Sequence, residues 1–230
     1  MIGVLVNSIT IILGSLLGLL LKKGIPQKFS NAIMTGVALC VVYIGISNVI
    51  KGGCNDLALI FGMVAGAITG TLMDINGKIE RLGKWVEEKF ADKGKNSSVA
   101  EGFVTASLLF CVGAMAVTGS IAAGQGENSI VFTKSVLDMI SASMLTVSLG
   151  FGVMLSSVSI FVYQGVIALL SGVISAYLTQ EMSATLICAG GLLIFALGLN
   201  MLGITKIKVA DYLPALIFAP IFCLVFSFIM

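Results

Sequence analysis

Long runs of residues without a charged side chain dominate the sequence. A helix crosses the roughly 30 Å hydrocarbon core of a bilayer with about 20 mostly apolar residues. The runs are continuously apolar rather than alternating, so the pattern predicts transmembrane helices and not strands. No Asp, Glu, Lys or Arg occurs in residues 1–21, 29–50, 57–73, 102–126, 139–180, 182–205 and 212–230.

These runs predict an all-α, polytopic transmembrane bundle of about eight helices, forming one transmembrane domain over residues 1–230. The run at 139–180 is long enough for two crossings, and we place their boundary at Ser156-Ser157-Val158-Ser159. An alternative interpretation has seven helices and one re-entrant segment. The eight expected helices span about residues 3–21, 31–50, 57–73, 102–123, 132–154, 157–178, 183–203 and 211–229.

One long polar stretch, residues 74–101, interrupts the apolar pattern. Its apolar residues recur every three or four positions, which is the spacing of one helix face. We therefore expect the third helix to extend into an amphipathic cytoplasmic arm that ends in a polar linker. The apolar face consists of Ile75, Ile79, Leu82, Val86 and Phe90.

The composition excludes several classes of protein. Apolar residues make up 58% of the chain and charged residues only 10%, whereas soluble domains hold about 25% charged residues. The net charge of +2 provides no basic patch for nucleic acid. The chain has no histidine, no CxxC pair and no GxSxG or HExxH motif. We therefore expect no metal site, no cofactor and no enzyme activity.

Positively charged residues are divided unevenly between the two sides of the predicted bundle. Eleven Lys and Arg residues follow the first, third, fifth and seventh helices, and the other side holds only Lys51 and Lys134. Because positively charged loops stay in the cytoplasm, we expect both termini outside and residues 74–101 inside.

Two parts of the sequence resemble each other weakly. The stretch IMTGVALCVVYIGISNVI from Ile33 and the stretch LICAGGLLIFALGLNMLGI from Leu186 align at a shift of 153 residues, which places Gly45 on Gly198. An odd number of crossings separates the copies, so they point in opposite directions. We expect an inverted repeat that relates helices 1–3 to helices 6–8, an arrangement that recurs in transporters with a site near mid-membrane.

Asp138 is the acidic residue that falls well inside a predicted span, and a carboxylate there is a functional candidate because its insertion costs about 2.5–3.5 kcal/mol. Lys134 lies four residues earlier, on the same helix face. Two interpretations remain open. Asp138 binds an ion or a polar solute, or it only forms an ion pair with Lys134 at the outer interface.

Further candidates come from a glycine-rich segment and from amides within the spans. The segment GAMAVTGSIAAG at 113–124 can break a helix and free backbone groups to line a cavity. The amides each need a partner in lipid, and an interhelical hydrogen bond satisfies that need as well as a ligand does. The candidate residues are Gly113, Thr118, Gly119, Ser120, Asn7, Asn48, Gln164 and Asn200.

Several stretches together resemble the YqgA-like family of bacterial multi-pass inner-membrane proteins, which carries a domain-of-unknown-function label. They are ILGSLLGLLLKKGIP, Met73-Asp74-Ile75, FCVGAMAVTGSI, KSVLDMISASM, VYQGVIALLSG and GLNMLGITKIKVADYLPAL. The resemblance implies a location in the inner membrane and a transport role, with no agreed substrate or catalytic residues. The chain departs from the expected pattern at Ala210-Asp211-Tyr212, where we would expect an Asn before Leu-Pro.

From these features we expect a membrane transporter or channel for a small ion or polar solute. The alternative is a membrane assembly or regulatory protein that uses the arm at 74–101 to hold a partner and transports nothing. The expected partners are the lipid bilayer, the ion or solute and a second copy of the chain in a homo-oligomer. We expect no nucleic-acid partner.

Overall fold

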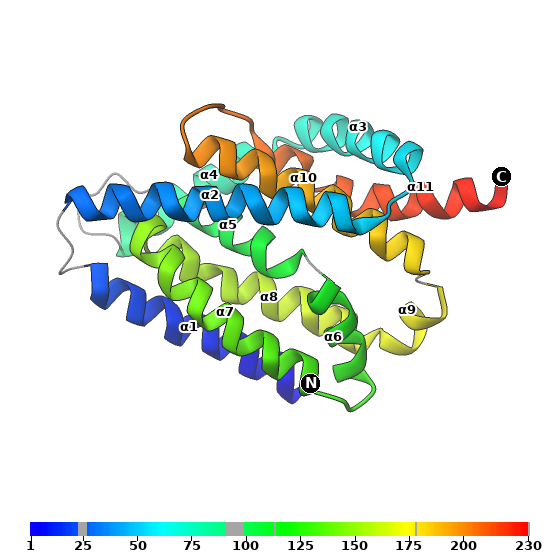
Figure 1. Ribbon diagram of the computed structural model, residues 1–230, viewed down its shortest axis with the longest axis horizontal. Helices are drawn as coiled ribbons and strands as arrows, with labels where there is room; N and C mark the ends of the chain where they lie inside the picture. Colours follow the sequence, from blue (N-terminus) through cyan, green and yellow to red (C-terminus); the bar gives the residue numbers. More distant parts are fainter. Residues whose placement is uncertain (23–26, 91–98, 113, 178, 230) are drawn as a thin grey trace. The chain divides into compact units, whose positions relative to one another are not determined.

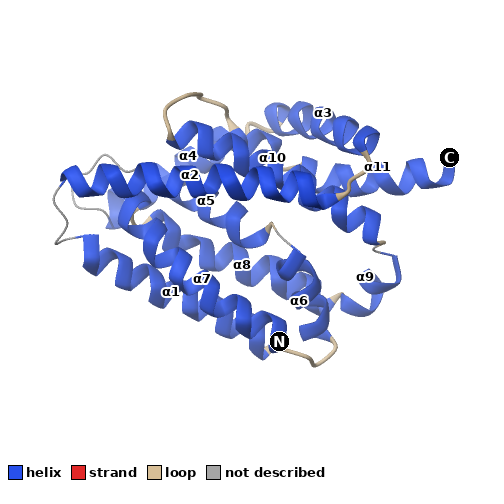
Figure 2. Cartoon of the chain, viewed as in Figure 1, coloured by secondary structure: helices blue, strands red, loops and turns tan. Residues whose placement is uncertain are grey.

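The structure is a computed structural model that describes residues 1–22, 27–90, 99–112, 114–177 and 179–229. Within these ranges the chain is built from helices joined by turns and short loops, with no strand (Figures 1 and 2). The all-α prediction is therefore confirmed. The helices are α1 (Ile2–Lys22), α2 (Gln27–Gly52), α3 (Asp56–Leu72), α4 (Ile75–Phe90), α5 (Val99–Cys111), α6 (Ala114–Gly124), α7 (Ser129–Leu149), α8 (Gly152–Leu169), α9 (Ser171–Tyr177), α10 (Gln180–Met201), the short 3-10 helix η1 (Val209–Tyr212) and α11 (Ala215–Ile229).

Among the described residues, five helical segments are long and apolar enough to cross a membrane. Two bent pairs, α3 with α4 and α5 with α6, raise this number to seven if each pair forms one span. Helix α2 contributes a shorter apolar stretch at Met34–Ile50. The described residues thus contain five to seven candidate membrane spans, and the count of eight stays a prediction.

The boundary that we placed at Ser156–Ser159 is wrong. Helix α7 ends at Leu149 and α8 begins at Gly152, so the serines lie inside α8. Gly150 adopts a positive φ of 77°, a conformation that glycine tolerates and other residues rarely adopt. The hydroxyls of Ser156 and Ser157 donate to Val153 O and Met154 O of their own helix, so serines need not interrupt it.

Residues 75–90 form the predicted amphipathic helix, but it is a separate element rather than a straight extension of α3. The chain bends by 52° between α3 and the start of α4, and Asp74 at the bend has a positive φ of 48°. The carboxylate Oδ1 of Asp211 accepts a hydrogen bond of 2.8 Å from the backbone N–H of Asn76, which fixes the first turn of α4. The linker at 91–98 lies outside the described residues.

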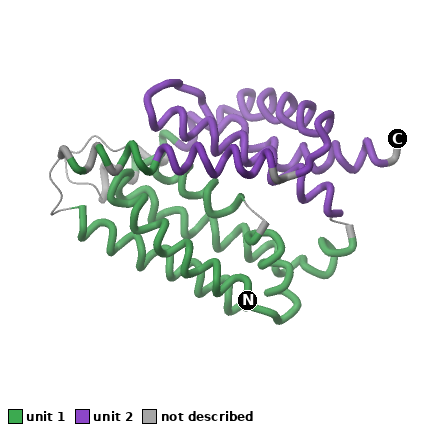
Figure 3. The backbone as a smooth tube through the Cα atoms, in the orientation of Figure 1, with its two compact units in different colours: residues 1–37, 80–177 green, residues 38–79, 178–230 purple. Residues whose placement is uncertain are grey.

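The described chain separates into two compact units (Figure 3). Unit 1 comprises Met1–Val37 and Glu80–Tyr177, and unit 2 comprises Ala38–Ile79 and Leu178–Met230. In unit 1, α1 packs closely against α7. A Cβ atom at Gly14 or Gly18 would overlap the backbone oxygen of Met139 or Ser143, respectively. Small residues thus let the two backbones touch, as is common between membrane helices.

In unit 2, α3 packs antiparallel on η1 and α11 through two matching rows of mostly small residues. A Cβ atom at Gly62 would lie 2.5 Å from Ala219 Cα, and one at Gly66 would lie 2.5 Å from Ala215 N. A shift of 153 residues takes Gly62 to Ala215 and Gly66 to Ala219. The two contacts are therefore reciprocal, which means that each glycine touches the residue equivalent to the other glycine. The two buried rows, offset by the same shift, are Ala58, Gly62, Gly66 and Gly70, and Asp211, Ala215, Ala219 and Cys223.

The contact between α2 and α10 in the same unit is reciprocal in the same way. A Cβ atom at Gly45 would lie 2.5 Å from Phe195 N, and one at Gly198 would lie 2.9 Å from Val42 N. The shift of 153 residues takes Gly45 to Gly198 and Val42 to Phe195. Within each of the two antiparallel helix pairs of unit 2, the same shift of 153 residues therefore relates one contact to the other.

The packing of α3 on α11 generates a prediction. Gly66→Ala places a methyl group against the Ala215 backbone, and we expect it to destabilise the fold by about 1–3 kcal/mol because overpacking forces backbone shifts. Thermal unfolding of the purified protein in detergent measures the effect. The control is Gly36→Ala in α2, where a Cβ meets nothing within 4 Å. We expect this control to leave stability equal or higher, since alanine favours helix. Equal unfolding midpoints for Gly66→Ala and wild type would contradict the close packing.

Candidate functional site

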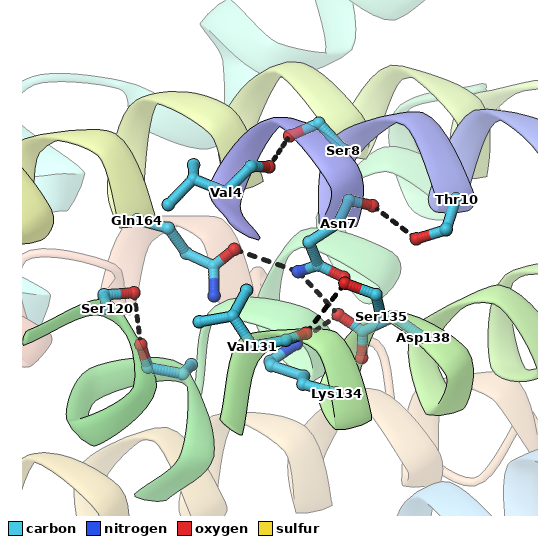
Figure 4. Close-up of polar contacts among 11 residues, drawn as sticks. Val4, Asn7, Ser8, Thr10, Ser120, Val131, Lys134, Ser135, Asp138 and Gln164 are labelled. Atoms are coloured by element: carbon cyan, nitrogen blue, oxygen red, sulfur yellow. Dashed lines mark hydrogen bonds and ion pairs between the residues drawn. The ribbon is translucent and has the colours of Figure 1, made fainter. Parts of the chain in front are cut away.

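Four polar side chains from three apolar helices meet inside unit 1 (Figure 4). They are Asn7 on α1, Lys134 and Asp138 on α7, and Gln164 on α8. The amide nitrogen of Asn7 donates to Asp138 Oδ2 at 3.1 Å and to Gln164 Oε1 at 2.9 Å. The Lys134 ammonium forms an ion pair with the same Asp138 oxygen. We call these four residues the polar cluster.

The sequence brings the cluster together through helix periodicity. On α1, Asn7 belongs to the buried face that continues through Ile11, Gly14 and Gly18 at spacings of four, three and four. The two glycines draw α7 against this face, so the side chain of Asp138 reaches Asn7. Asp138 is the tenth residue of the 21-residue α7 and therefore lies near the middle of that helix.

The cluster is strongly buried for a group of polar residues. Asn7 and Gln164 have no exposed surface, and Lys134 and Asp138 are 6% and 7% exposed. An unpaired ion at such a position would be very unfavourable, so the ammonium and the carboxylate neutralise each other. The ion pair that we left open as one interpretation is present, but it lies within the helix contact and not at an exposed surface.

The ion pair also fixes the orientation of both amides. Asn7 must present its NH₂ group to the carboxylate, because its oxygen would be repelled there. The same NH₂ group then requires Gln164 to present its oxygen. This arrangement leaves Asn7 Oδ1 and Gln164 Nε2 buried without a hydrogen-bond partner among the described residues. A buried unsatisfied polar atom costs about 1–3 kcal/mol, so the cluster has capacity for a further ligand.

An aromatic residue that sequence reasoning missed completes the surroundings of Lys134. Phe110, in the last turn of α5, presents its ring to the Lys134 ammonium at 5.8 Å from the centroid. This distance falls within the range of cation–π attraction. No sequence pattern links Phe110 to Lys134, because the contact depends on where α5 ends.

We predicted that the glycine-rich segment at 113–124 can break a helix, and the structure has α6 over Ala114–Gly124 of that segment, after the end of α5 at Cys111. Helices α5 and α6 are bent by 65°, and Gly113 lies at the break, outside the described residues. Ser120 is fully buried and donates to Ala116 O of its own helix. Gly119 lies against α7, where a Cβ would meet Ile130 Cγ2 at 3.0 Å, and Thr118 is exposed. The hydroxyl of Ser120 therefore serves its own helix and not the polar cluster.

The other two predicted site residues belong to unit 2. Asn200 braces the turn after α10, because its Nδ2 donates to Ile207 O at 2.7 Å and its Oδ1 accepts from Ile207 N at 2.9 Å. Asn48 lies where α2 meets α10, and its backbone oxygen accepts from Cys188 Sγ at 4.0 Å. Among the described residues, no group of three or more His, Cys, Asp or Glu side chains is placed to hold a metal ion.

The buried ion pair generates a second prediction. Lys134→Met leaves the Asp138 carboxylate buried without its cation, and we expect a loss of about 3–5 kcal/mol in the free energy of unfolding. The double substitution Lys134→Met with Asp138→Leu removes both charges, and we expect it to recover most of that loss. Thermal unfolding in detergent measures both variants. Additive losses in the double variant would contradict a coupled buried pair.

Comparisons with known proteins extend over almost the whole chain. The model of the family described as "Protein of unknown function (DUF554)" matches residues 2–224. The chain is 32% identical to the uncharacterized membrane protein YdfK of Bacillus subtilis, over 96% of this chain and 95% of that one. It is 29% identical to the uncharacterized protein YqgA of Escherichia coli, over 95% and 94% of the two chains. No solved structure matches. The chain therefore belongs to the DUF554 family of proteins, as the resemblance to YqgA-like proteins indicated.

Proposed function

We propose that this protein is a transporter or channel that moves a small ion or polar solute across a bacterial inner membrane, with the polar cluster as its binding site. The observation that carries the proposal is the ion pair and two amides buried between three apolar helices. Ionisable residues within membrane helices are rare and often mark ion or substrate pathways. The proposal assigns no catalytic step.

The break between α5 and α6 supports this proposal. A helix interruption frees backbone carbonyl and amide groups, and in a membrane these groups are tolerated only against protein or a water-filled cavity. Broken helices supply binding sites in many transporters. The break follows Phe110, the residue that contacts Lys134, so the interruption adjoins the polar cluster within unit 1.

The reciprocal contacts of unit 2 support the inverted repeat that we propose as the architecture. A twofold relation exchanges the partners of each contact, as observed for Gly62–Ala219 with Gly66–Ala215. The same shift of 153 residues also exchanges the α2–α10 contacts. Antiparallel helix pairs of this kind are expected when two copies cross the membrane in opposite directions.

A second candidate function rests on α4. The Asp211 carboxylate binds the start of this amphipathic helix and holds it at a bend from α3. A helix held in this way is suited to an assembly or regulatory protein that binds a partner through the arm. The two candidates differ in one measurable property, because this second function involves no flux.

Flux measurements test the proposed function. We expect proteoliposomes containing the protein to admit at least one of two probes, thallium as a small cation or glycerol as a polar solute. Asp138→Asn should abolish the flux, because it removes the charge to which the Lys134 ammonium and the Asn7 amide bind. Glu127→Gln is the control, since it removes an exposed carboxylate shortly before α7. No flux of either probe through wild-type protein, or full flux through Asp138→Asn, would contradict the proposal.

The proposed topology places both termini outside and residues 74–101 in the cytoplasm. Unit 1 supports one part of it, because the Met1 ammonium donates to Ala123 O at 3.3 Å and Gly3 N donates to Asn128 Oδ1 at 3.0 Å. The N-terminus and the α6–α7 connection therefore share one side. We expect alkaline phosphatase fused to either terminus to be active and a green fluorescent protein fusion at the C-terminus to be dark. The opposite pattern would overturn the topology.

A further inference from the structure

The centre of the polar cluster has the character of a cation site. Two oxygens, Asp138 Oδ2 and Gln164 Oε1, lie 3.1 Å and 2.9 Å from the Asn7 amide nitrogen. The Lys134 ammonium contacts the same carboxylate oxygen. The groups that face these acceptors are therefore an ammonium and the positive end of an amide dipole. Together they compensate the negative charge of the oxygens, as a bound cation would.

The Asn7 amide can serve as a third oxygen ligand. Its Oδ1 is fully buried and has no hydrogen-bond partner among the described residues. A half-turn about the last side-chain bond exchanges Oδ1 with Nδ2, and this torsion is roughly twofold in amides. Oδ1 would then face the carboxylate oxygen and Gln164 Oε1. Three oxygens in such proximity repel one another unless a cation lies between them, so the amide orientation depends on which positive group is present.

Lys134 has a second favourable position when it leaves the carboxylate. The Phe110 ring is already within cation–π range of the ammonium, at 5.8 Å. Phe110 is the penultimate residue of α5, and the C-terminal end of a helix carries partial negative charge that stabilises a cation. A small rotation of the flexible lysine side chain can therefore move the ammonium from Asp138 towards the end of α5.

We propose that the polar cluster binds a small monovalent metal cation, such as sodium, in competition with the Lys134 ammonium. The inference rests on the proposed function, because it names the ion that the same site would take. Asp138, Asn7 and Gln164 supply the oxygen ligands, one from each of three helices. A single carboxylate compensates one positive charge. When sodium takes that place, the displaced Lys134 ammonium depends on the Phe110 ring and on the partial negative charge at the end of α5. A divalent ion would add one more positive charge that nothing in the cluster compensates.

Cation-dependent stability of the purified protein in detergent tests the proposal. A ligand that binds only the folded state stabilises it by RT ln(1 + [L]/Kd), so the unfolding temperature rises with the ligand concentration. We expect sodium chloride to raise the unfolding midpoint of wild-type protein relative to choline chloride at equal ionic strength. In Lys134→Met the internal competitor is absent, so the same rise in the unfolding midpoint should be reached at an about tenfold lower sodium concentration.

Three further variants provide the controls. Asp138→Asn removes the charged ligand and should abolish the sodium effect. Ser8→Ala should respond as wild type does, because the Ser8 hydroxyl, next to Asn7 in sequence, donates to Val4 O of its own helix. Lys134→Arg keeps the competing charge and holds the carboxylate more firmly, so it should need more sodium than wild type. If Lys134→Met does not fold, the comparison of Lys134→Arg with wild type still tests the competition between sodium and the side chain at position 134.

Specific outcomes overturn the proposal. Equal sodium responses of Lys134→Met, Lys134→Arg and wild type would exclude competition, and a response that persists in Asp138→Asn would exclude this site. Stabilisation that depends on proton concentration alone, with no effect of sodium, would also overturn it. Glycerol flux without any sodium effect would disprove the cation site and leave the transport function intact. A sodium effect that Asp138→Asn abolishes, without flux of either probe, would support the site and disprove transport.

Discussion

The fold of unit 1 depends on one electrostatic constraint, which is that charge buried among apolar helices must be neutralised within the protein. Asp138 meets this constraint with Lys134 one turn away on α7 and with Asn7 on α1. The consequences extend beyond the pair. The carboxylate sets the orientation of the Asn7 amide, and that amide sets the orientation of Gln164 on α8. One charged side chain thereby links three helices, and it acts together with the glycine contacts that set α1 against α7.

Close backbone contact makes this network possible. Membrane helices gain little from the hydrophobic effect when they pack against one another, because lipid is as apolar as their side chains. Gly14 and Gly18 let α1 approach the backbone of α7, and Gly62 and Gly66 let α3 approach α11. In unit 1 the close approach brings polar side chains within hydrogen-bond distance. In unit 2 it produces packing without a buried ion pair among the described residues, and the one buried carboxylate, Asp211, caps the start of α4.

Sequence reasoning identified the features that follow from helix periodicity. It missed the features that depend on how the helices are rotated and packed in space. The approximate positions of most helices followed from apolar runs, although the boundary between α7 and α8 did not. Asn7 and Gln164 stood out as amides within such runs, and Asp138 stood out as an acidic residue inside a predicted span. Their convergence was not predictable, because it requires the rotation of α1, α7 and α8 about their axes. The contact of Phe110 with Lys134 joins α5 to α7, and no pattern along the sequence links the two residues. Asn48 and Asn200 have equally suggestive sequence positions, yet both lie in unit 2, and Asn200 braces a turn.

The position of the amides within the sequence repeat bears on their role. A shift of 153 residues takes Asn7 to Ile160 and Ile11 to Gln164, and all four side chains are fully buried. Burial at these positions therefore does not itself require an amide, because isoleucine fills the matching positions without an unsatisfied polar atom. Asn7 and Gln164 instead leave one acceptor and one donor without a partner among the described residues, at a cost in stability. These two unpartnered atoms belong to the amides that join the buried carboxylate, at positions where the packing itself would accept isoleucine.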